Sequence, residues 1–391
     1  MTLAYLRLLF ALQVVDIHSR FFQHIFNHYI YPHIHLPFLW LGDGHLAVEG
    51  FFMMSGYLVA LISQSNKNLF HFTFTRYARI YPLYWLVLAF YLLVYSYFHL
   101  FGSYKLPHIS PFILILNLTL IPAIINFFDI NQTNIFWKLY IVPSWSLTFD
   151  VILYPFGFIL SKYPILGLPI ILSSIPLFVY LFKYHQPHIA FQSSQHTFFF
   201  DFLYSLPAFI FIPFFLGILL FKLKDYIPIK KPLFIGAFLL YLYLSYFPLY
   251  LPSMFVGYLL SLLSLSYMIV YVASFGKSKY ESLISNYTYS LYLIHYPIII
   301  YFFHHKPIGI LLSLLVALIF LIPETIFERL RHKLKKPSTE TSPNILIAVG
   351  IVFVIIFTFS NLLFSSIMPV YLSWYQNHYQ IQLQRALLKA F

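Results

Sequence analysis

Long apolar runs follow one another along most of this chain, and they constrain the fold more than any other feature. A transmembrane helix needs about 20 consecutive apolar residues, and runs of roughly that length recur between residues 2 and 368. The composition agrees, because 61% of the residues are hydrophobic and only 9% are charged. A soluble domain has about a quarter of charged residues, and a membrane barrel shows alternating segments of about ten residues. We therefore predict an all-α fold, a polytopic transmembrane helical bundle.

The apolar runs predict eleven spans, about ten in a core and one appended at the C-terminal end. Loops rich in Lys and Arg stay on the cytoplasmic side of a membrane, so these loops orient the spans. One further run, 113–125, is short for a span, and a full crossing there would put the later basic loops on the wrong side. We interpret it as re-entrant or interfacial, with the N-terminus cytoplasmic and the C-terminus outside. The predicted spans are 2–22, 46–64, 80–101, 145–161, 163–183, 202–222, 232–250, 253–275, 286–304, 307–327 and 344–368.

The same pattern divides the chain into three parts. A membrane domain covers 1–327, a basic cytoplasmic linker covers 328–343, and an extra transmembrane helix with an amphipathic tail covers 344–391. The net charge of +12 is explained by the loops, so we expect the lipid bilayer and no nucleic acid as a partner. The absence of cysteine excludes disulfides and thiol chemistry. Histidines in the loops 21–45 and 184–201 have irregular spacing, so we expect no metal site.

The first apolar run, 3–22, carries Arg7, Asp16 and His18. A charged group at membrane depth costs a few kcal/mol, so such residues usually face a protein interior or a wet cavity. Arg7 and His18 lie near one helix face, about 16 Å apart along the helix axis. This spacing predicts a permanent cation near one membrane surface and a titratable imidazole near the other. The alternative is that Arg7 and Arg20 anchor the helix ends and that His18 is an interfacial polar residue.

Two further segments place charged groups near a membrane surface. Glu49 stands where the second span begins, beside small residues that let helices approach closely. Arg76 and Arg79 are three residues apart on one helix face, just before another span. Paired guanidinium groups suit a phosphate, because each can donate two hydrogen bonds to it. The pair predicts a docking point for a phosphorylated donor, or else ordinary anchoring on the cytoplasmic side.

The segments WSLTFD and YSLYLIHYP place polar groups inside spans. Asp150 and Tyr154 are one turn apart on the same helix face, and an acid inside a span is a functional candidate. Asp150 could orient or polarise His18, as the third group does in a nucleophile–base pair. An intramembrane histidine is, however, more often a hydrogen-bonded packing residue than a catalyst. The candidates in the second segment are Ser290, Tyr292 and His295.

Taken together, these segments resemble the acyltransferase-3 family of integral membrane O-acyltransferases. The resemblance implies transfer of an acyl group, usually acetyl, from cytoplasmic acyl-coenzyme A to a hydroxyl group of a glycan or glycolipid, such as lipopolysaccharide O-antigen. It also implies that His18 is the essential histidine, that Arg7 is its motif partner, and that Arg76 and Arg79 bind acetyl-CoA. The matching pieces occur in the family's order over about residues 3–327: Arg7-x10-His18, GHLAVEGFFMMSGYL, Arg76-x-x-Arg79 followed by Ile-Tyr-Pro, WSLTFD and YSLYLIHYP.

The resemblance implies a bacterial inner membrane protein in which His18 acts as a general base or as a transient acyl carrier. Asp150 or Glu49 would orient its imidazole. Asp150 stands where Glu is commoner in the family, and we find no esterase-like domain, so transfer would finish in the membrane domain or with a partner. The competing interpretation is a proton-coupled transporter with His18, Asp16 and Asp150 as a relay. A transporter of that kind favours broken helices in paired positions, which the sequence lacks.

Overall fold

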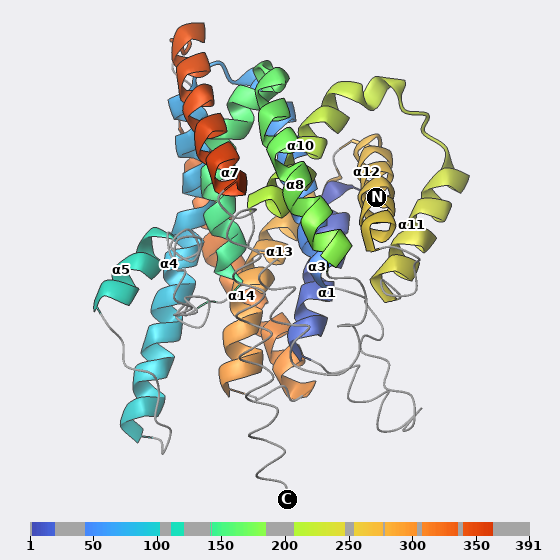
Figure 1. Ribbon diagram of the computed structural model, residues 1–391. Helices are drawn as coiled ribbons and strands as arrows, with labels where there is room; N and C mark the ends of the chain where they lie inside the picture. The colour runs from blue at the N-terminus through green and yellow to red at the C-terminus, as the bar shows by residue number, and fades with distance from the viewer. Residues whose placement is uncertain are drawn as a thin grey trace, which may run out of the picture.

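The computed structural model describes residues 2–19, 44–101, 111–120, 141, 143–184, 207–246, 254–276, 278–302, 307–334 and 339–362. Within these ranges the chain forms a bundle of helices without a strand (Figure 1). In lipid a helix satisfies its own backbone hydrogen bonds, which favours this architecture for so apolar a chain. The all-helical membrane fold is therefore confirmed. Most of the predicted histidine-rich loops 21–45 and 184–201 lies outside the described residues. The tail beyond residue 362 also lies outside them.

Six helices in the described part of the chain are long and apolar enough to cross a bilayer. The exact number of spans, about ten plus one, stays a prediction. The six are Leu46–Ser65, Leu69–Val94, Ser144–Lys162, Val256–Ala273, Ile308–His332 and Pro343–Leu362. The labelled elements are α1 (Leu3–Ser19), α3 (Gly44–Ser65), α4 (Leu69–Phe101), α5 (Pro111–Thr119), α7 (Ser144–Lys162), η3 (Pro164–Gly167), α8 (Leu168–Tyr184), α10 (Pro207–Leu223), η5 (Lys224–Tyr226), α11 (Lys231–Tyr246), α12 (Met254–Ala273), α13 (Glu281–Tyr296), the π-helix η6 (Pro297–Phe302) and α14 (Pro307–His332).

Helices α1 and α13 run parallel and in register. The backbone N–H of Ala4 donates to Oε1 of Glu281 at 3.1 Å, and near the other ends of the two helices His18 contacts His295. Both contacts join residues 277 positions apart in the sequence. A constant offset over most of both helices means that the two begin at the same end of the bundle. This agrees with the predicted topology, in which both spans start at the same membrane surface.

Helices α3 and α10 approach each other closely through two glycines. A Cβ atom on Gly56 would lie 1.8 Å from the backbone oxygen of Phe214, and one on Gly217 would lie 1.9 Å from that of Met53. No side chain fits at either position, because real Cβ contacts are never so short. Small residues at helix contacts are typical of membrane bundles. Gly56, one of the small residues near Glu49, thus allows the close helix packing that the sequence predicted.

Several basic loops meet at one end of the bundle, which we call the basic end. A cavity of about 700 Å³ there lies between the ends of α3, α7 and α10 and is lined by Lys67, Lys162, Lys222 and Lys224. Glu340 from the linker also lines it, and its ion pair with Lys67 raises the pKa of the lysine amine. Loops that the charge pattern assigned to one membrane surface therefore do share one end of the fold. Which surface this is stays a prediction.

The short helix α5 lies beside α4 (Figure 1) and stops partway along it. Its nine residues rise only about 14 Å, less than half of the hydrocarbon thickness of about 30 Å. Tyr84 donates to the carbonyl of Asn117 at 2.7 Å, and Trp85 donates to that of Leu118 at 2.9 Å. These bonds satisfy carbonyl groups at the end of the helix. The predicted re-entrant path continues into residues that the structure does not describe.

The C-terminal helix Pro343–Leu362 (red in Figure 1) packs on the outside of α7 and α8. The ring of Phe353 stacks on that of Phe156 at 5.0 Å between centroids. The side chain of Asn361 donates to Oγ of Ser173 at 3.1 Å. Thr341 in the linker accepts from the backbone of Leu69 at 2.8 Å. The predicted appended helix therefore contacts the bundle at several points along its length.

Candidate functional site

Two histidines from α1 and α13 face each other near the end of α1 that lies away from the basic end. Nδ1 of His18 lies 3.0 Å from Nε2 of His295, and the two rings stack with centroids 5.2 Å apart. His295 is fully buried, whereas His18 is half-buried. The ring of Tyr296 meets His18 edge-on at 4.9 Å. His295, predicted only as a further candidate, is therefore in direct contact with the residue predicted to be essential.

The backbone fixes the tautomers of this histidine pair. Nδ1 of His295 lies 3.1 Å from the carbonyl oxygen of Leu291, and because a carbonyl only accepts, this nitrogen carries a proton. A buried neutral imidazole then has its lone pair on Nε2. That lone pair faces Nδ1 of His18, so His18 carries its proton on Nδ1 and presents a lone pair on Nε2. The pair therefore leaves His18 in the form that a general base needs.

Tyr292 connects the end of α13 that carries His295 to α7. Its hydroxyl lies 2.7 Å from Oγ of Ser146 and donates to the carbonyl of Pro143 at 2.9 Å. Its ring centroid is 6.1 Å from that of His295. Ser290, by contrast, donates to the backbone of its own helix at 3.0 Å. Tyr292 is thus part of the site, and Ser290 has a local backbone partner. Directly after Tyr296 the helix widens into the π-helix η6, an arrangement often found at functional sites.

Toward the basic end, one serine joins two of the predicted arginines. Oγ of Ser285 accepts from Nη1 of Arg7 at 3.1 Å and from Nη2 of Arg79 at 3.3 Å. A serine hydroxyl has two acceptor lone pairs, so it can serve both. Arg7 of α1 and Arg79 of α4 therefore meet on α13, ten residues before His295. Helices α1 and α13 thus contact each other at Arg7 and Ser285 near one end and at His18 and His295 near the other.

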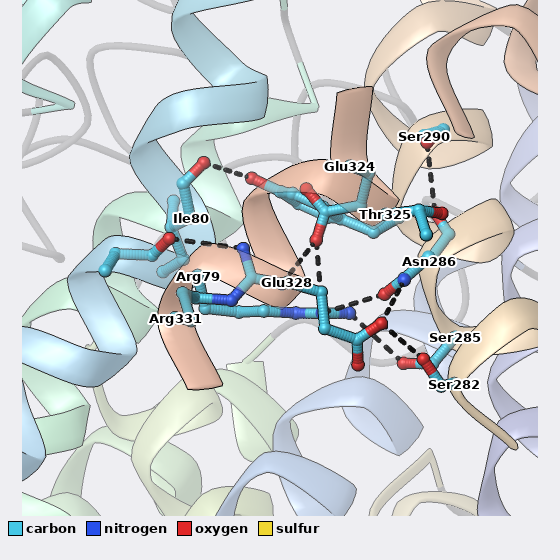
Figure 2. A network of polar contacts seen from close by, with 12 residues as sticks. Arg79, Ile80, Ser282, Ser285, Asn286, Ser290, Glu324, Thr325, Glu328 and Arg331 are labelled. Atoms are coloured by element: carbon cyan, nitrogen blue, oxygen red, sulfur yellow. Dashed lines mark hydrogen bonds and ion pairs between the residues drawn. The ribbon is translucent and has the colours of Figure 1, made fainter. Parts of the chain in front are cut away.

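A network of ion pairs surrounds Arg79 (Figure 2). Its Nη1 lies 2.8 Å from Oδ1 of Asn286 and 3.1 Å from Oε1 of Glu324. Glu324 is fully buried, and the same oxygen is 2.8 Å from Nη2 of Arg331. Glu328, one turn further along α14, accepts from Asn286 at 2.7 Å. These contacts tie α4, α13 and α14 together, and they hold Arg79 at the centre of the network.

Arg76 lies in a different environment, next to Asp150 and Tyr154. Its guanidinium carbon is 5.8 Å from the ring centroid of Phe72. Asp150 faces the hydroxyl groups of Tyr154 and Ser55, and it lies within electrostatic range of Arg7 and Arg76. The predicted acid thus sits among the arginines. The structure gives His18 the ring of His295 as a hydrogen-bond partner, and the orienting role assigned to Asp150 stays a prediction.

Two other predicted acids are buried. Glu49 is 2% exposed and lies within electrostatic range of the Tyr258 hydroxyl of α12. Asp16 is 9% exposed, and its backbone carbonyl accepts from Ser19 at 2.8 Å. Burial of both acids agrees with the expectation that charged groups in these spans face the protein interior.

Glu324, Glu328 and Ser285 were not among the site residues predicted from the sequence. Glu324 had a usable signal, because it is an acid close to the end of the apolar run 307–327 and such acids are functional candidates. Ser285 had none, since a serine at the start of a span carries no charge or motif. Its position matters only because α1 and α4 both bring an arginine to it.

The fold and these buried charges define a multi-pass membrane protein with a polar site that runs along α1 and α13. A sequence profile described as an acyltransferase domain, that of the acyltransferase-3 family, matches residues 3–359. The chain therefore belongs to this family, and the predicted resemblance is confirmed. The match extends into the C-terminal helix Pro343–Leu362. No curated protein and no solved structure gives a significant match.

Proposed function

We propose that this membrane acyltransferase moves an acyl group, and specifically acetyl, from acyl-CoA to a hydroxyl group of a cell-surface glycan or glycolipid such as lipopolysaccharide O-antigen. Membership of the acyltransferase-3 family supports acyl transfer. The same membership favours this function over a proton-coupled transporter built on His18, Asp16 and Asp150. O-linked transfer, the CoA donor and the glycan acceptor are parts of the proposal.

The observation that carries the proposal is the contact between His18 and His295. Nδ1 of His18 donates to Nε2 of His295 at 3.0 Å, because the Leu291 carbonyl fixes the tautomer of His295. A base oriented by a second hydrogen-bonded group is the arrangement that activates hydroxyl nucleophiles in acyl transfer. His18 is half-buried, which combines access for a substrate with a restricted orientation.

The proposed chemistry needs one proton carrier. Nε2 of His18 takes the proton from the acceptor hydroxyl while the acceptor oxygen attacks the carbonyl carbon of the thioester. The carbon–sulfur bond breaks as the new ester forms, and the leaving thiolate takes the proton from the imidazolium, so that free CoA thiol is released. General base catalysis of this kind is worth about 10²–10⁴-fold in rate. The same lone pair would serve if His18 carried the acyl group transiently.

The donor would bind with its phosphates toward the basic end. Arg7 and Arg76 lie on that side of the histidine pair, near Asp150 and Tyr154. Guanidinium groups donate forked hydrogen bonds to phosphate oxygens, and the pantetheine arm would carry the thioester along α1 toward His18. The water-lined passage that this path requires stays a prediction, since the cavity described at the basic end lies between α3, α7 and α10.

The proposed location is the bacterial inner membrane, with the N-terminus and the basic end in the cytoplasm. The concentration of lysines around the ends of α3, α7 and α10 supports this orientation. Acyl-CoA is made in the cytoplasm and a surface glycan is displayed outside, so His18, at the far end of α1, would lie on the acceptor side. No metal ion is needed for this chemistry.

Mass spectrometry of the surface glycan tests the proposed acceptor. Cells that carry the gene should show glycan species heavier by one acetyl group per modified site, and cells without it should lack them. Complementation with wild-type protein should restore the modification, whereas complementation with His18→Ala should not. Identical glycan spectra in all strains, with the protein present in the membrane, would exclude a glycan acceptor.

A further inference from the structure

The two arginines of the Arg76-x-x-Arg79 motif have different environments, although they lie one turn apart on α4. Arg79 has defined partners on two other helices: Asn286 and Ser285 of α13 and Glu324 of α14. Arg76 differs, because its Nε is buried and has no hydrogen-bond partner among the described residues. A buried donor without a partner is costly, since it has lost its water and gained nothing in return.

The charge of Arg79 is matched within the protein. Glu324 is fully buried between Arg79 and Arg331, and Glu328 accepts from Asn286 in the same network (Figure 2). Removal of one member of such a buried pair is strongly destabilising, because it leaves the other charge uncompensated. Arg79 therefore holds three helices together, and its guanidinium already has the partners that a phosphate would have to displace.

The charge of Arg76 is less well matched. It lies within electrostatic range of Arg7, Arg79 and Arg331, all of which repel it. Asp150 lies near both Arg76 and Arg7, and Glu281 also lies within electrostatic range of Arg7. These three neighbouring guanidinium groups raise the local positive potential at Arg76, which favours an incoming anion. The guanidinium carbon of Arg76 lies 5.8 Å from the ring centroid of Phe72, and stacking on an aromatic ring uses the face of a guanidinium group and not its N–H groups.

We propose that Arg76 alone of the motif pair binds the phosphate groups of the donor, and that Arg79 is a positioning residue which Glu324 locks between α13 and α14. This inference rests on the proposed function, because it takes CoA to be the ligand. It assigns a role to Glu324, which holds α4 so that Arg76 stays beside Arg7. The motif then contains one binding residue and one structural residue, and each should respond differently to substitution.

The test uses the purified full-length protein in detergent and two measurements, the Kd for CoA and the midpoint of thermal unfolding. Arg76→Gln should raise the Kd for CoA by about 10- to 100-fold, the range expected for a lost hydrogen bond to a charged group, without lowering the midpoint. Arg76→Lys should recover part of the affinity, since it restores the charge but not the two parallel hydrogen bonds of a guanidinium group. Pantetheine, which lacks the phosphates, should bind both variants as it binds the wild type.

Arg79→Gln and Glu324→Gln should each lower the unfolding midpoint, and the double variant should be less destabilised than the two single effects combined, because both members of one buried pair are then neutral and Arg331 keeps Glu328 within electrostatic range. The Kd of the double variant for CoA should rise less than that of Arg76→Gln, because Arg79 and Glu324 act on the phosphate groups only through the position of Arg76. Arg329→Gln is the matched control, since Arg329 is an exposed arginine of α14 and should change neither quantity.

Two results would overturn the division of roles: wild-type CoA affinity in Arg76→Gln, or a folded Arg79→Gln/Glu324→Gln variant that loses as much affinity as Arg76→Gln. Failure of the proposed function gives a different pattern. In that case the wild-type protein itself binds no CoA and releases none from acetyl-CoA. The inference that Arg76 binds phosphate would then be wrong together with the proposed function. The unfolding midpoints would still show whether Glu324 holds Arg79 in place.

Discussion

Nδ1 of His18 and Nε2 of His295 lie 3.0 Å apart across the interface of α1 and α13. The second ring nitrogen of His295 is bonded to the carbonyl of Leu291, so the pair has a direction: the proton on His18 points to His295, and the lone pair of His18 points elsewhere. A contact between residues 277 positions apart thus sets the protonation pattern of the residue on which the proposed chemistry depends.

Substitution of His295 should reduce turnover rather than donor binding. His295→Ala removes the acceptor that holds the proton of His18 on Nδ1, so we expect kcat to fall by about tenfold or more, with KM for acetyl-CoA unchanged. The fall should not exceed the roughly 10²–10⁴-fold that a general base contributes. His295→Gln should recover part of the rate, because its side-chain oxygen can accept. Steady-state kinetics of the purified variants measure this. A folded His295→Ala protein with wild-type kcat would show that the ring contact has no part in catalysis.

The glycine contact between α3 and α10 should tolerate no side chain. Gly56→Ala would place a Cβ 1.8 Å from the Phe214 oxygen, so the helices must separate, which we expect to cost about 1–3 kcal/mol or more. Gly236→Ala is the control, because a Cβ there has nothing within 4 Å and alanine favours the helix by up to about 1 kcal/mol. Thermal unfolding in detergent compares the two. Equal midpoints for both variants would contradict the packing described.

Asp150 should stabilise the protein by compensating Arg7 and Arg76, to which it lies close. Asp150→Asn keeps the shape and removes the charge, so we expect a lower unfolding midpoint. CoA should then raise the unfolding midpoint of Asp150→Asn more than that of wild type, because a bound anion replaces the lost charge. The exposed Asp225 provides the control, and Asp225→Asn should change stability by less than about 0.5 kcal/mol. An Asp150→Asn midpoint equal to wild type would argue against the pairing.

The absence of cysteine makes the orientation of the bundle directly testable. Lys224→Cys places a single thiol at the basic end, beside the cavity between α3, α7 and α10. We expect a membrane-impermeant maleimide to label it only after the cells are opened, because basic loops face the cytoplasm. Asn27→Cys, in the predicted outer loop, should be labelled in intact cells. The reverse labelling pattern would place the basic end outside and would remove the proposed access to cytoplasmic acyl-CoA.

The sequence predicted those features that depend on composition and on short spacings. The apolar runs indicated the helical membrane fold, and the positions of Arg7 and His18 on one helix follow from the period of the helix. Glu324 could also have been predicted from the sequence, because it is an acid in an apolar run. Three of the basic segments that the charge pattern placed on one side, those of Lys67, Lys162 and Lys222 with Lys224, do meet around one cavity.

The partners across helix interfaces could not be predicted in this way. The structure puts His295 against His18, Asp150 beside the arginines and Glu49 near Tyr258. The predicted role of Asp150 or Glu49 in orienting His18 stays a prediction. Such contacts depend on the register of α1 against α13, which is set by packing along the whole interface and not by any local spacing. For the same reason Arg76 and Arg79 looked equivalent in the sequence, although only Arg79 meets Glu324.

The most direct test of the account is the release of free CoA thiol from acetyl-CoA by the purified protein in the presence of crude envelope glycan. The chain has no cysteine, so a thiol reagent reports only the product. We predict steady release by the wild type that depends on the glycan, and a rate lower by about 10²–10⁴-fold for His18→Ala with an unchanged unfolding midpoint. Release by folded His18→Ala at the wild-type rate would contradict the central claim that His18 is the base of an acyl transfer.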